Sequence, residues 1–418
     1  MNSEPVKIAV IGSGVAGLTA THILQRKHHV TLFEKDDRLG GHTNTVAVPE
    51  GPDAGIPVDT GFIVMNHRNY PLLTRLFEQL GVELRDSDMS FGYYDVPSGL
   101  QYSGSGLNGL FAQRINLLRP SFHRMVRDVL RFFKIAQQTI DENSLVDETL
   151  GEYLQRHAFS SEFIDHHLIP MGSAIWSTPC DSMLQFPALS FLQFFRNHGL
   201  LTVNDRPQWR TVLGGSSTYI ARMRQQWSQV TVRLNAGIAG IERRSSGAEL
   251  RFRDGGTELF DHVVLAVHAD QVLPMLQDAD QTEQELLGCW RYTNSRTVLH
   301  TDKSVMPPLK RVWSSWNFCR LEGSRTSLTY DMSRLQGLKT ANTLFVSLNP
   351  VREPAGIIRE FSYDHPMFTR EALLQRPKLA SLNGRRNTWF AGSYFGNGFH
   401  EDAVRSAVAV AKNFGMEL

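Results

Sequence analysis

Three glycines near the start of the chain have the spacing of a turn that binds a dinucleotide. Gly12, Gly14 and Gly17 form a Gly-x-Gly-x-x-Gly pattern. In such a turn the first glycine permits a tight bend, the second lets the backbone approach a pyrophosphate, and the third lets the following helix pack on the preceding strand. Glu34 stands farther along, where an acid accepts hydrogen bonds from a ribose. The chemistry predicted here is the binding of a dinucleotide.

The elements that must position these residues lie on either side of the turn. Residues 6–11 are an apolar run typical of a strand, residues 15–26 have a helical pattern that begins with Val15 and Ala16, and residues 30–33 predict a second strand. This order of strand, turn, helix, strand and acid predicts a Rossmann-like α/β fold, in which the helix N-terminus attracts the phosphates.

A second glycine-rich segment follows directly. Arg38 offers a planar donor to a diphosphate, and the adjacent Gly40 and Gly41 indicate a backbone that comes close to another part of the same ligand. The pattern Glu-x-x-x-Arg-x-Gly-Gly resembles the second FAD motif of the flavin-containing amine oxidase and phytoene desaturase superfamily. Residues 58–62 resemble its next motif, a loop that passes the isoalloxazine. The resemblance implies FAD as the cofactor, with contacts from Lys35, Arg38, Gly40, Gly41, His42, Thr60, Gly61 and Phe62.

The C-terminal segment resembles a third motif of the same superfamily. Residues 388–393 predict a buried strand, and residues 398–404 lead into a helix that we expect from Ala403 to about residue 414. The resemblance sets the start of this helix against the flavin, where its positive end stabilises charge on the reduced ring. It implies contacts from Gly392, Ser393, Glu401, Asp402, Ala403 and Val404, and from Ile238 and Ala266 in the central part of the chain. The superfamily usually has an acid at Ser393 and arginine at His42, so some contacts are expected to differ.

Three further segments narrow the resemblance. Residues 206–216, 313–317 and 392–402 together resemble a bacterial family of NAD/FAD-binding, amine-oxidase-like proteins, over residues 6 to 415. Its members often accompany cyclopropane fatty acid synthases. That association implies a small-molecule or lipid substrate, an acyl chain above all, and such a synthase as a partner.

The resemblance and the element pattern together predict two discontinuous domains. We expect a Rossmann-like FAD-binding domain of the amine oxidase type in residues 1–90, 205–290 and 380–418. A substrate domain of mixed sheet with an inserted helical lobe is expected in residues 91–204 and 291–379. The lobe corresponds to aromatic-rich helical patterns at residues 105 to 200.

No sequence motif marks a residue as a catalytic base. Lone histidines are more commonly structural, and none stands in a metal or triad pattern; those considered are His166, His167, His198, His268 and His400. Lys303 and Lys310 are candidates for a lysine near flavin N5, although surface positions are expected for both. The catalytic residue is therefore left unassigned and no metal is expected.

Aromatic side chains are the candidates for the substrate pocket. They are Trp313, Trp316, Tyr394 and Phe395. The phenylalanines between Phe186 and Phe195 either line an apolar tunnel or pack the helical lobe. Three functions stay open: hydride transfer from a fatty acyl or lipid chain to flavin N5, amine oxidation with O₂, and a noncatalytic flavoprotein partner of a lipid-modifying methyltransferase.

The composition excludes several other classes. Lys and Arg number 43 against 42 Asp and Glu, so the net charge of +1 provides no field for binding nucleic acid. No apolar run approaches the ~20 residues of a membrane span, although peripheral membrane contact stays open. The 3 cysteines are far apart and form no disulfide framework, which favours a cytoplasmic protein.

Overall fold

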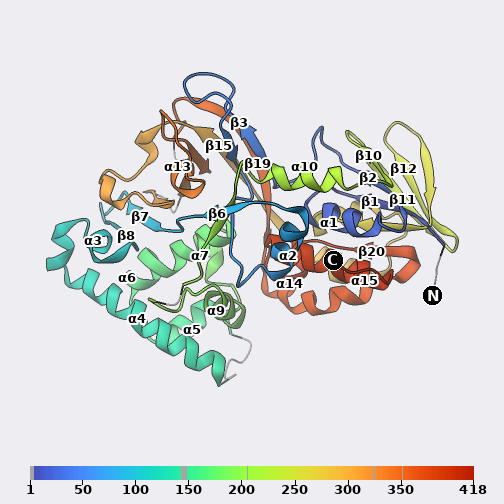
Figure 1. Ribbon diagram of the computed structural model, residues 1–418. Helices are drawn as coiled ribbons and strands as arrows, with labels where there is room; N and C mark the ends of the chain where they lie inside the picture. Colours follow the sequence, from blue (N-terminus) through green and yellow to red (C-terminus); the bar gives the residue numbers. More distant parts are fainter. Residues whose placement is uncertain (1–3, 143–147, 205, 323–324, 351) are drawn as a thin grey trace.

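The computed structural model describes residues 4–142, 148–204, 206–322, 325–350 and 352–418. They form two lobes, which lie side by side in Figure 1. The right-hand lobe contains a parallel sheet with α1 (Val15–Leu24) and α15 (His400–Asn413), and the left-hand lobe combines a large mixed sheet with a group of helices.

The parallel sheet has five strands in the order β10-β2-β1-β14-β20, and each neighbouring pair is parallel. The strands are β1 (Lys7–Ile11), β2 (His29–Phe33), β10 (Val230–Arg233), β14 (His262–Leu265) and β20 (Thr388–Phe390). Because the carboxyl ends of parallel strands meet at one edge, the turns that follow these strands lie together there. This sheet confirms the predicted Rossmann-like α/β fold.

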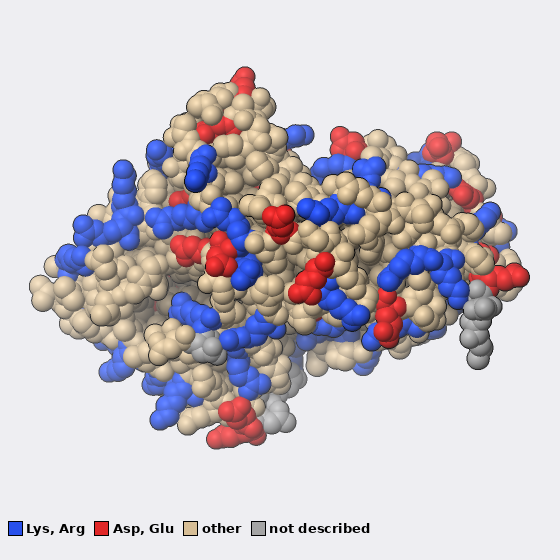
Figure 2. Space-filling view, in the orientation of Figure 1, with Lys and Arg blue, Asp and Glu red and all other residues tan. Residues whose placement is uncertain are grey.

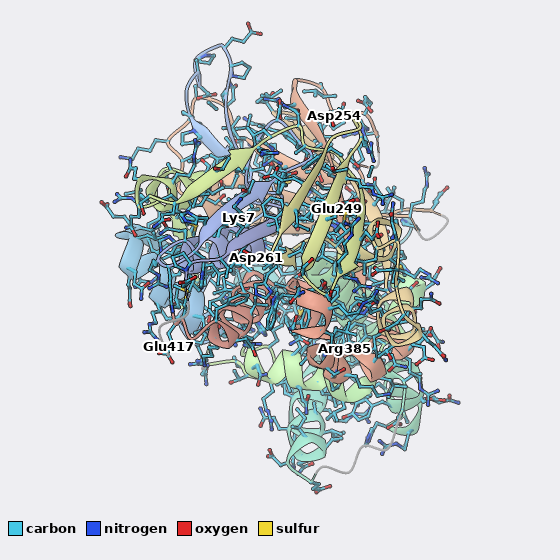
Figure 3. All side chains as sticks on the ribbon, turned by 90° about the vertical axis from the view of Figure 1, so that its right-hand side faces the viewer. Lys7, Glu249, Asp254, Asp261, Arg385 and Glu417 are labelled. Atoms are coloured by element: carbon cyan, nitrogen blue, oxygen red, sulfur yellow. The ribbon has the colours of Figure 1, made fainter. Side chains whose placement is uncertain are left out.

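Alternate side chains of β1 serve two separate cores. Ile8 and Val10 pack with α1 and α15, whereas Ala9 and Ile11 pack toward an antiparallel sheet of three strands, as the period of two in a strand requires. That sheet consists of β11 (Ile238–Arg244), β12 (Gly247–Phe252) and β13 (Thr257–Phe260). Figure 3 shows it beside the parallel sheet, near Lys7, whose backbone N–H donates to the Asp261 carboxylate at 2.7 Å.

The last helix begins earlier than the sequence predicts. We expected it from Ala403, but α15 starts at His400. The reason is a local cap: the Asp402 carboxylate accepts hydrogen bonds from the backbone N–H groups of Asn397 and Phe399, at 2.9 and 3.2 Å. These bonds satisfy donors at the helix start and extend the helix toward the cavity described below.

The left-hand lobe contains a seven-stranded sheet in the order β19-β15-β18-β17-β16-β7-β8. Its strands are β7 (Phe91–Asp95), β8 (Gln101–Ser103), β15 (Arg291–His300), β16 (Trp316–Arg320), β17 (Thr326–Asp331), β18 (Phe345–Leu348) and β19 (Ile357–Met367). The long edge strand β19 pairs along the whole of β15 and brings its last residues close to the right-hand lobe.

All of the regular elements that the structure describes between residues 106 and 197 are helices. They are α3 (Gly106–Leu110), the 3₁₀ helix η1 (Arg114–Leu118), α4 (Pro120–Asp141), α5 (Leu150–Arg156), α6 (Ser161–Phe163), the π-helix η2 (Ile164–Leu168), α7 (Ile169–Trp176), α8 (Cys180–Met183) and α9 (Ala188–Asn197). None of the helices that the structure describes is both long enough and apolar enough to span a bilayer. The predicted domain boundaries stay a prediction.

Shorter elements connect the two lobes. Small sheets pair β3 (Thr45–Ala47) with β4 (Pro57–Asp59), and β9 (Arg210–Val212) with both β5 (Val64–Met65) and β6 (Leu84–Asp86). Further helices that the structure describes are α2 (Pro71–Leu80), α10 (Ser217–Gln225), α11 (Ala269–Met275), α12 (Gln281–Gly288), α13 (Met332–Leu335) and α14 (Arg370–Gln375), with 3₁₀ helices η3 (Lys303–Val305), η4 (Lys310–Val312), η6 (Arg376–Leu382), η7 (Arg385–Asn387) and η8 (Ser393–Phe395).

Candidate active site

A cavity of about 2620 Å³ begins at the carboxyl edge of the parallel sheet and continues into the helical lobe. A pocket for one small molecule usually encloses about 300–1,000 Å³. The cavity therefore has room for a dinucleotide and for a second molecule. We call the part beside the parallel sheet the nucleotide end, and the part between α4, α7 and α9 the distal end.

The first glycine-rich turn has the geometry that phosphate binding needs. A Cβ on Gly12 would lie 2.6 Å from the Ala266 carbonyl oxygen, and a Cβ on Gly17 would lie 1.9 Å from the Gly12 carbonyl oxygen, so only glycine fits at either position. Gly14 is different, because a Cβ there would meet no protein atom within 4 Å and would face the cavity. The backbone of Gly14 is thus open to a ligand.

The second glycine-rich loop packs directly against this turn. Gly40 and Gly41 have φ angles of +119° and +56°, and a Cβ on Gly41 would lie 3.3 Å from Gly14 Cα. The Arg38 guanidinium donates to the carbonyl oxygens of Gly41 at 2.8 Å and Thr43 at 3.2 Å. These bonds hold the loop in shape, and the diphosphate contact of Arg38 stays a prediction.

Glu34 is buried at the end of β2 and lines the cavity. Its Oε2 accepts hydrogen bonds from the Ser13 backbone N–H at 2.9 Å and the Ser13 hydroxyl at 2.5 Å, and its Oε1 accepts one from the Asp36 N–H at 3.1 Å. The carboxylate is therefore held firmly beside the first turn. Its bond to a ribose stays a prediction.

The third loop and the C-terminal helix meet at the same place. A Cβ on Gly61 would lie 2.1 Å from the His42 carbonyl oxygen. The Phe62 ring stacks on the His400 ring with centroids 3.8 Å apart, and His400 Nε2 lies 3.1 Å from Thr43 Oγ1. Segments far apart in the sequence therefore converge on one cavity.

Two acids of the C-terminal motif have structural partners and do not line the cavity. The Glu401 carboxylate accepts hydrogen bonds from the backbone N–H groups of Leu72 and Leu73, at the start of α2, at 3.1 and 2.9 Å. Asp402 caps its own helix, as described above. Burial raises the pKa of Glu401. The carboxylates of both acids thus brace helix starts, and the cofactor contacts predicted for these two residues stay predictions.

The other predicted cofactor residues divide in a simple way. Those that line the cavity are Gly12, Gly14, Val15, Ala16, Glu34, Lys35, Arg38, Gly40, Gly41, His42, Gly61, Phe62, Ile238, Ala266, Gly392, Ser393 and Ala403. Gly17, Thr60 and Val404 lie behind this lining. Of the substrate candidates, Trp316 and Tyr394 line the cavity. Trp313 and Phe395 do not, and the Trp313 indole donates to the Pro307 carbonyl at 2.7 Å.

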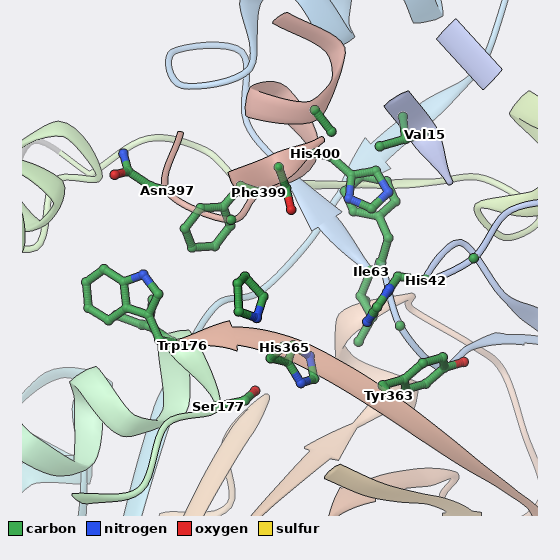
Figure 4. Close-up of a pocket in the computed structure, with 18 of the residues that line it drawn as sticks. Val15, His42, Ile63, Trp176, Ser177, Tyr363, His365, Asn397, Phe399 and His400 are labelled. Carbon is green, nitrogen blue, oxygen red and sulfur yellow. The ribbon is translucent and has the colours of Figure 1, made fainter. Parts of the chain in front are cut away.

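Polar rings surround the centre of the cavity. The ring of His42 lies 5.0 Å from that of Tyr363, 5.4 Å from that of His365 and 5.9 Å from that of His268. Burial lowers the pKa of His268 to about 4 and those of His365 and His400 to about 3. These imidazoles are therefore neutral near pH 7. Figure 4 shows Val15 and His400 on one side of the space, with Tyr363 and His365 opposite.

Several atoms here fit a bound flavin nucleotide. His42 Nε2, His268 Nδ1, His365 Nδ1 and the Tyr394 hydroxyl are buried with no hydrogen-bond partner among the described residues. Buried polar atoms in folded proteins are normally paired. The edge of an isoalloxazine ring carries carbonyl and nitrogen atoms that could pair with these unpaired, neutral groups beside the glycine-rich turns. The residues present therefore fit FAD.

The other candidates lie elsewhere. His166 Nδ1 lies 2.9 Å from the Tyr93 hydroxyl, and the His198 ring stacks on Phe194 at 3.8 Å. His167 and His198 line the distal part, whereas His166 does not. Lys303 and Lys310 are exposed and lie outside the cavity lining.

The distal end is predominantly apolar. Its wall includes Met125, Val126, Val129, Phe132, Phe133, Phe163, Leu168, Met171, Ile175, Trp176, Phe194, Phe195 and Leu200. All four phenylalanines pack in the lobe core, and Phe194 and Phe195 line the cavity as well. Packing of the lobe, one of the two alternatives, therefore holds for all four rings, and a tunnel for an acyl chain stays a prediction.

Sequence reasoning missed Tyr363 and His365 on β19. The Tyr363 hydroxyl lies 2.8 Å from Thr60 Oγ1, and Asn44 Nδ2 donates to it at 2.8 Å. The available signal was alternation: Phe361, Tyr363 and His365 are ring-bearing residues at every second position, which share one face of a strand.

Comparisons with known proteins agree with this site. Residues 15–356 match the family described as flavin containing amine oxidoreductase. A proposed flavin-containing monoamine oxidase of Mycobacterium tuberculosis is 28% identical over 266 residues, which cover 60% of this chain and 55% of that protein. The chain thus spans about half the length of this curated relative.

Solved structures share the fold over the whole chain. A fatty acid isomerase from P. acnes, which produces CLA, superposes with a TM-score of 0.70 at 16% identity and covers 99% of this chain and 100% of its own. A cyclohexylamine oxidase from Brevibacterium oxydans superposes with a TM-score of 0.68 at 17% identity, over 98% of this chain and 100% of its own. At these identities the likeness is one of fold.

Proposed function

The chain belongs to the flavin-containing amine oxidoreductases, and on that premise we propose that it is an FAD-dependent oxidoreductase that takes hydride from a hydrophobic substrate, a fatty acyl or other lipid chain. The fold does not choose the substrate, because a fatty acid isomerase and an amine oxidase share it. The shape and chemistry of the cavity support the choice.

The apolar distal end is the observation that carries the proposal. Met125, Val126, Val129, Phe132 and Phe133 form one stripe along α4, at the spacing of a single helix face. Rings and aliphatic chains of α7 and α9 line the wall with them. Burial of each methylene is worth about 0.8 kcal/mol, so a long chain gains far more here than a small polar molecule.

The residues around the nucleotide end have tasks that follow from their positions. FAD, when bound, supplies the hydride acceptor. The glycine turns admit its diphosphate, and the stacked Phe62 and His400 rings close one side against water. Neutral His42 and His365 offer hydrogen bonds without placing a charge next to an apolar substrate.

Amine oxidation with O₂ is the second candidate, favoured by the monoamine oxidase relative. Such a site needs an open space between two rings for the amine. No such pair is identified in this sequence, and the stacked rings of Phe399 and Phe194, with centroids 5.1 Å apart, leave no space for an amine between them. The cavity lining, as far as the structure describes it, has a single lysine, Lys35, which lies beside Glu34 at the nucleotide end.

A third possibility concerns a partner. The bacterial family that the sequence resembles often accompanies cyclopropane fatty acid synthases, which supports a role beside a lipid-modifying methyltransferase. In that role this chain would be a noncatalytic flavoprotein partner.

Anaerobic bleaching of the bound flavin tests the proposal. The yellow protein is mixed under nitrogen with detergent-solubilised phospholipids and fatty acids, and separately with polyamines and monoamines, while the visible flavin absorbance is followed. We expect bleaching by an acyl substrate. In Val129→Trp, the indole would block the distal end, so bleaching should slow at least about tenfold with unchanged FAD content.

The matched control is Gln138→Trp, an exposed residue of the same helix outside the cavity lining. It should bleach like the parent protein. Rapid bleaching by an amine alone would refute the acyl proposal. Absence of bleaching by every compound, even with an associated synthase present, would favour the noncatalytic partner.

A further inference from the structure

Exposed apolar side chains gather at one end of the helical lobe. Of the twelve large apolar side chains that are exposed among the described residues, five lie between residues 107 and 130. They are Leu107, Ile115, Leu117, Leu118 and Leu130. Leu107 is 76% exposed and Leu118 is 80% exposed. Water-exposed leucines at this density mark a surface that contacts something apolar.

This surface is continuous with the cavity. Leu107 and Leu130 are exposed and also line the distal end, as does Val203, which is 60% exposed. The cavity therefore reaches solvent between apolar side chains of α3, α4 and the segment after α9.

The same segment carries a strong local positive charge. Residues 105–135 contain six Lys and Arg and one acid, Asp128, in a chain whose net charge is only +1. Asp128 is buried and pairs with Arg131, and Arg124 pairs with Glu162 of α6. No acid of the described residues forms an ion pair with Arg114, Arg119 or Arg127. In Figure 2 the left-hand end of the molecule is a largely uncharged projection with Lys and Arg around it.

We propose that this surface, formed by α3, η1 and the first half of α4, docks on an anionic lipid bilayer, so that an acyl chain passes from the membrane into the cavity without crossing water. Leu117 and Leu118 would insert at the level of the headgroups, flanked by Arg114 and Arg119, whose long side chains reach lipid phosphates. The inference rests on the proposed function, because it supplies the route for a lipid substrate.

A bilayer is favoured over a protein partner by the combination of features. Arg114 and Arg119 flank the exposed leucines of the short 3₁₀ helix η1, and α4 continues directly from it, so that apolar and basic side chains alternate as at a membrane interface. Each Lys or Arg near an anionic surface strengthens binding by about fivefold. The cavity mouth lies in the same surface, which a membrane would seal.

Flotation with vesicles tests the docking surface. Holoprotein is mixed with vesicles of equal parts phosphatidylcholine and phosphatidylglycerol, or of phosphatidylcholine alone, and the floating fraction is measured. We expect binding to the anionic vesicles, at least about tenfold weaker binding to neutral ones, and release by high salt. The double substitution Leu117→Asp with Leu118→Asp should weaken binding at least about tenfold.

Leu374→Asp is the matched control, because Leu374 is 58% exposed on α14, outside this surface. It should float like the parent, and all variants should keep their FAD, which shows that they fold. Failure of the parent to float, or equal flotation of the double variant, would overturn the inference. It would also be overturned if the double variant lost binding to a synthase while neither protein bound vesicles. If the flavin is bleached by detergent-solubilised lipid but the protein does not float, the docking inference fails and the proposed function stands. If the protein floats but no lipid bleaches the flavin, the proposed function fails and the docking inference stands.

Discussion

Gly14 and Gly17 stand three positions apart in one turn, yet their substitution by alanine should have opposite consequences. Gly14 has φ −60° and ψ 173°, which an alanine adopts, and the new Cβ would meet no protein atom within 4 Å. It would occupy cavity space that a diphosphate must approach. At Gly17 the new Cβ would lie 1.9 Å from the Gly12 carbonyl oxygen. Gly14→Ala should therefore impair cofactor binding, and Gly17→Ala should impair folding.

The magnitudes follow from these contacts. One lost hydrogen bond to a charged phosphate is worth about 1.5–3 kcal/mol, so the Kd of Gly14→Ala for FAD should rise roughly ten- to a hundredfold. The free energy of unfolding of the Gly14→Ala apoprotein should change by less than about 1 kcal/mol. Alanine is a poorer N-cap than glycine, but it also restricts the unfolded chain, and these two effects offset each other. Overlap with backbone in Gly17→Ala should cost about 3 kcal/mol or more.

The assay measures binding and folding separately. FAD is titrated into apoprotein while flavin fluorescence is followed, and thermal unfolding is recorded by circular dichroism. Gly288→Ala is the control, because its Cβ would make an ordinary contact 3.6 Å from Leu273 Cδ1, outside the cavity. If Gly14→Ala bound FAD as tightly as the parent, or if Gly288→Ala lost FAD equally, the proposed position of the diphosphate would be wrong.

Three further outcomes are expected. Removing FAD should lower Tm, because a ligand at a hundred times its Kd contributes about 2.7 kcal/mol to native stability; an unchanged Tm on adding FAD back would contradict the site. Burial holds the pKa of His365 and of His400 at about 3 in the folded protein. Below about pH 6.5, the ordinary pKa of histidine, the unfolded chain therefore binds more protons than the folded one. The apoprotein should be fully stable above that pH and lose about 1–2 kcal/mol per histidine by pH 5. Urea titrations at both pH values measure this, and a flat profile would show that these rings are not buried. Glu401→Ala should cost about 2 kcal/mol by stranding the Leu72 and Leu73 N–H groups, and Glu401→Gln less, with FAD affinity retained in both; loss of FAD from folded Glu401→Gln would give the acid a cofactor role instead.

The sequence alone determined the nucleotide end of the site. Gly12, Gly14 and Gly17 carry their meaning locally, because a bend, a ligand approach and a helix contact all depend on spacing within one turn. The second loop could also be predicted, since Gly40 and Gly41 both need positive φ angles that other residues rarely adopt. Order of elements along the chain then sufficed for a Rossmann-like sheet.

Tertiary structure alone decided the rest, because those positions depend on pairing between distant segments. Glu401 is adjacent to Asp402 and next to His400, yet it points to the start of α2, since a helix turns neighbouring side chains to different sides. His365 reaches the cavity only because β19 pairs along β15 in one register, and a shift by one residue would turn it to the other face. The apolar stripe of α4 likewise lines a cavity because α7 and α9 leave space opposite it. Had these helices packed directly against the stripe, the same residues would have formed part of the core.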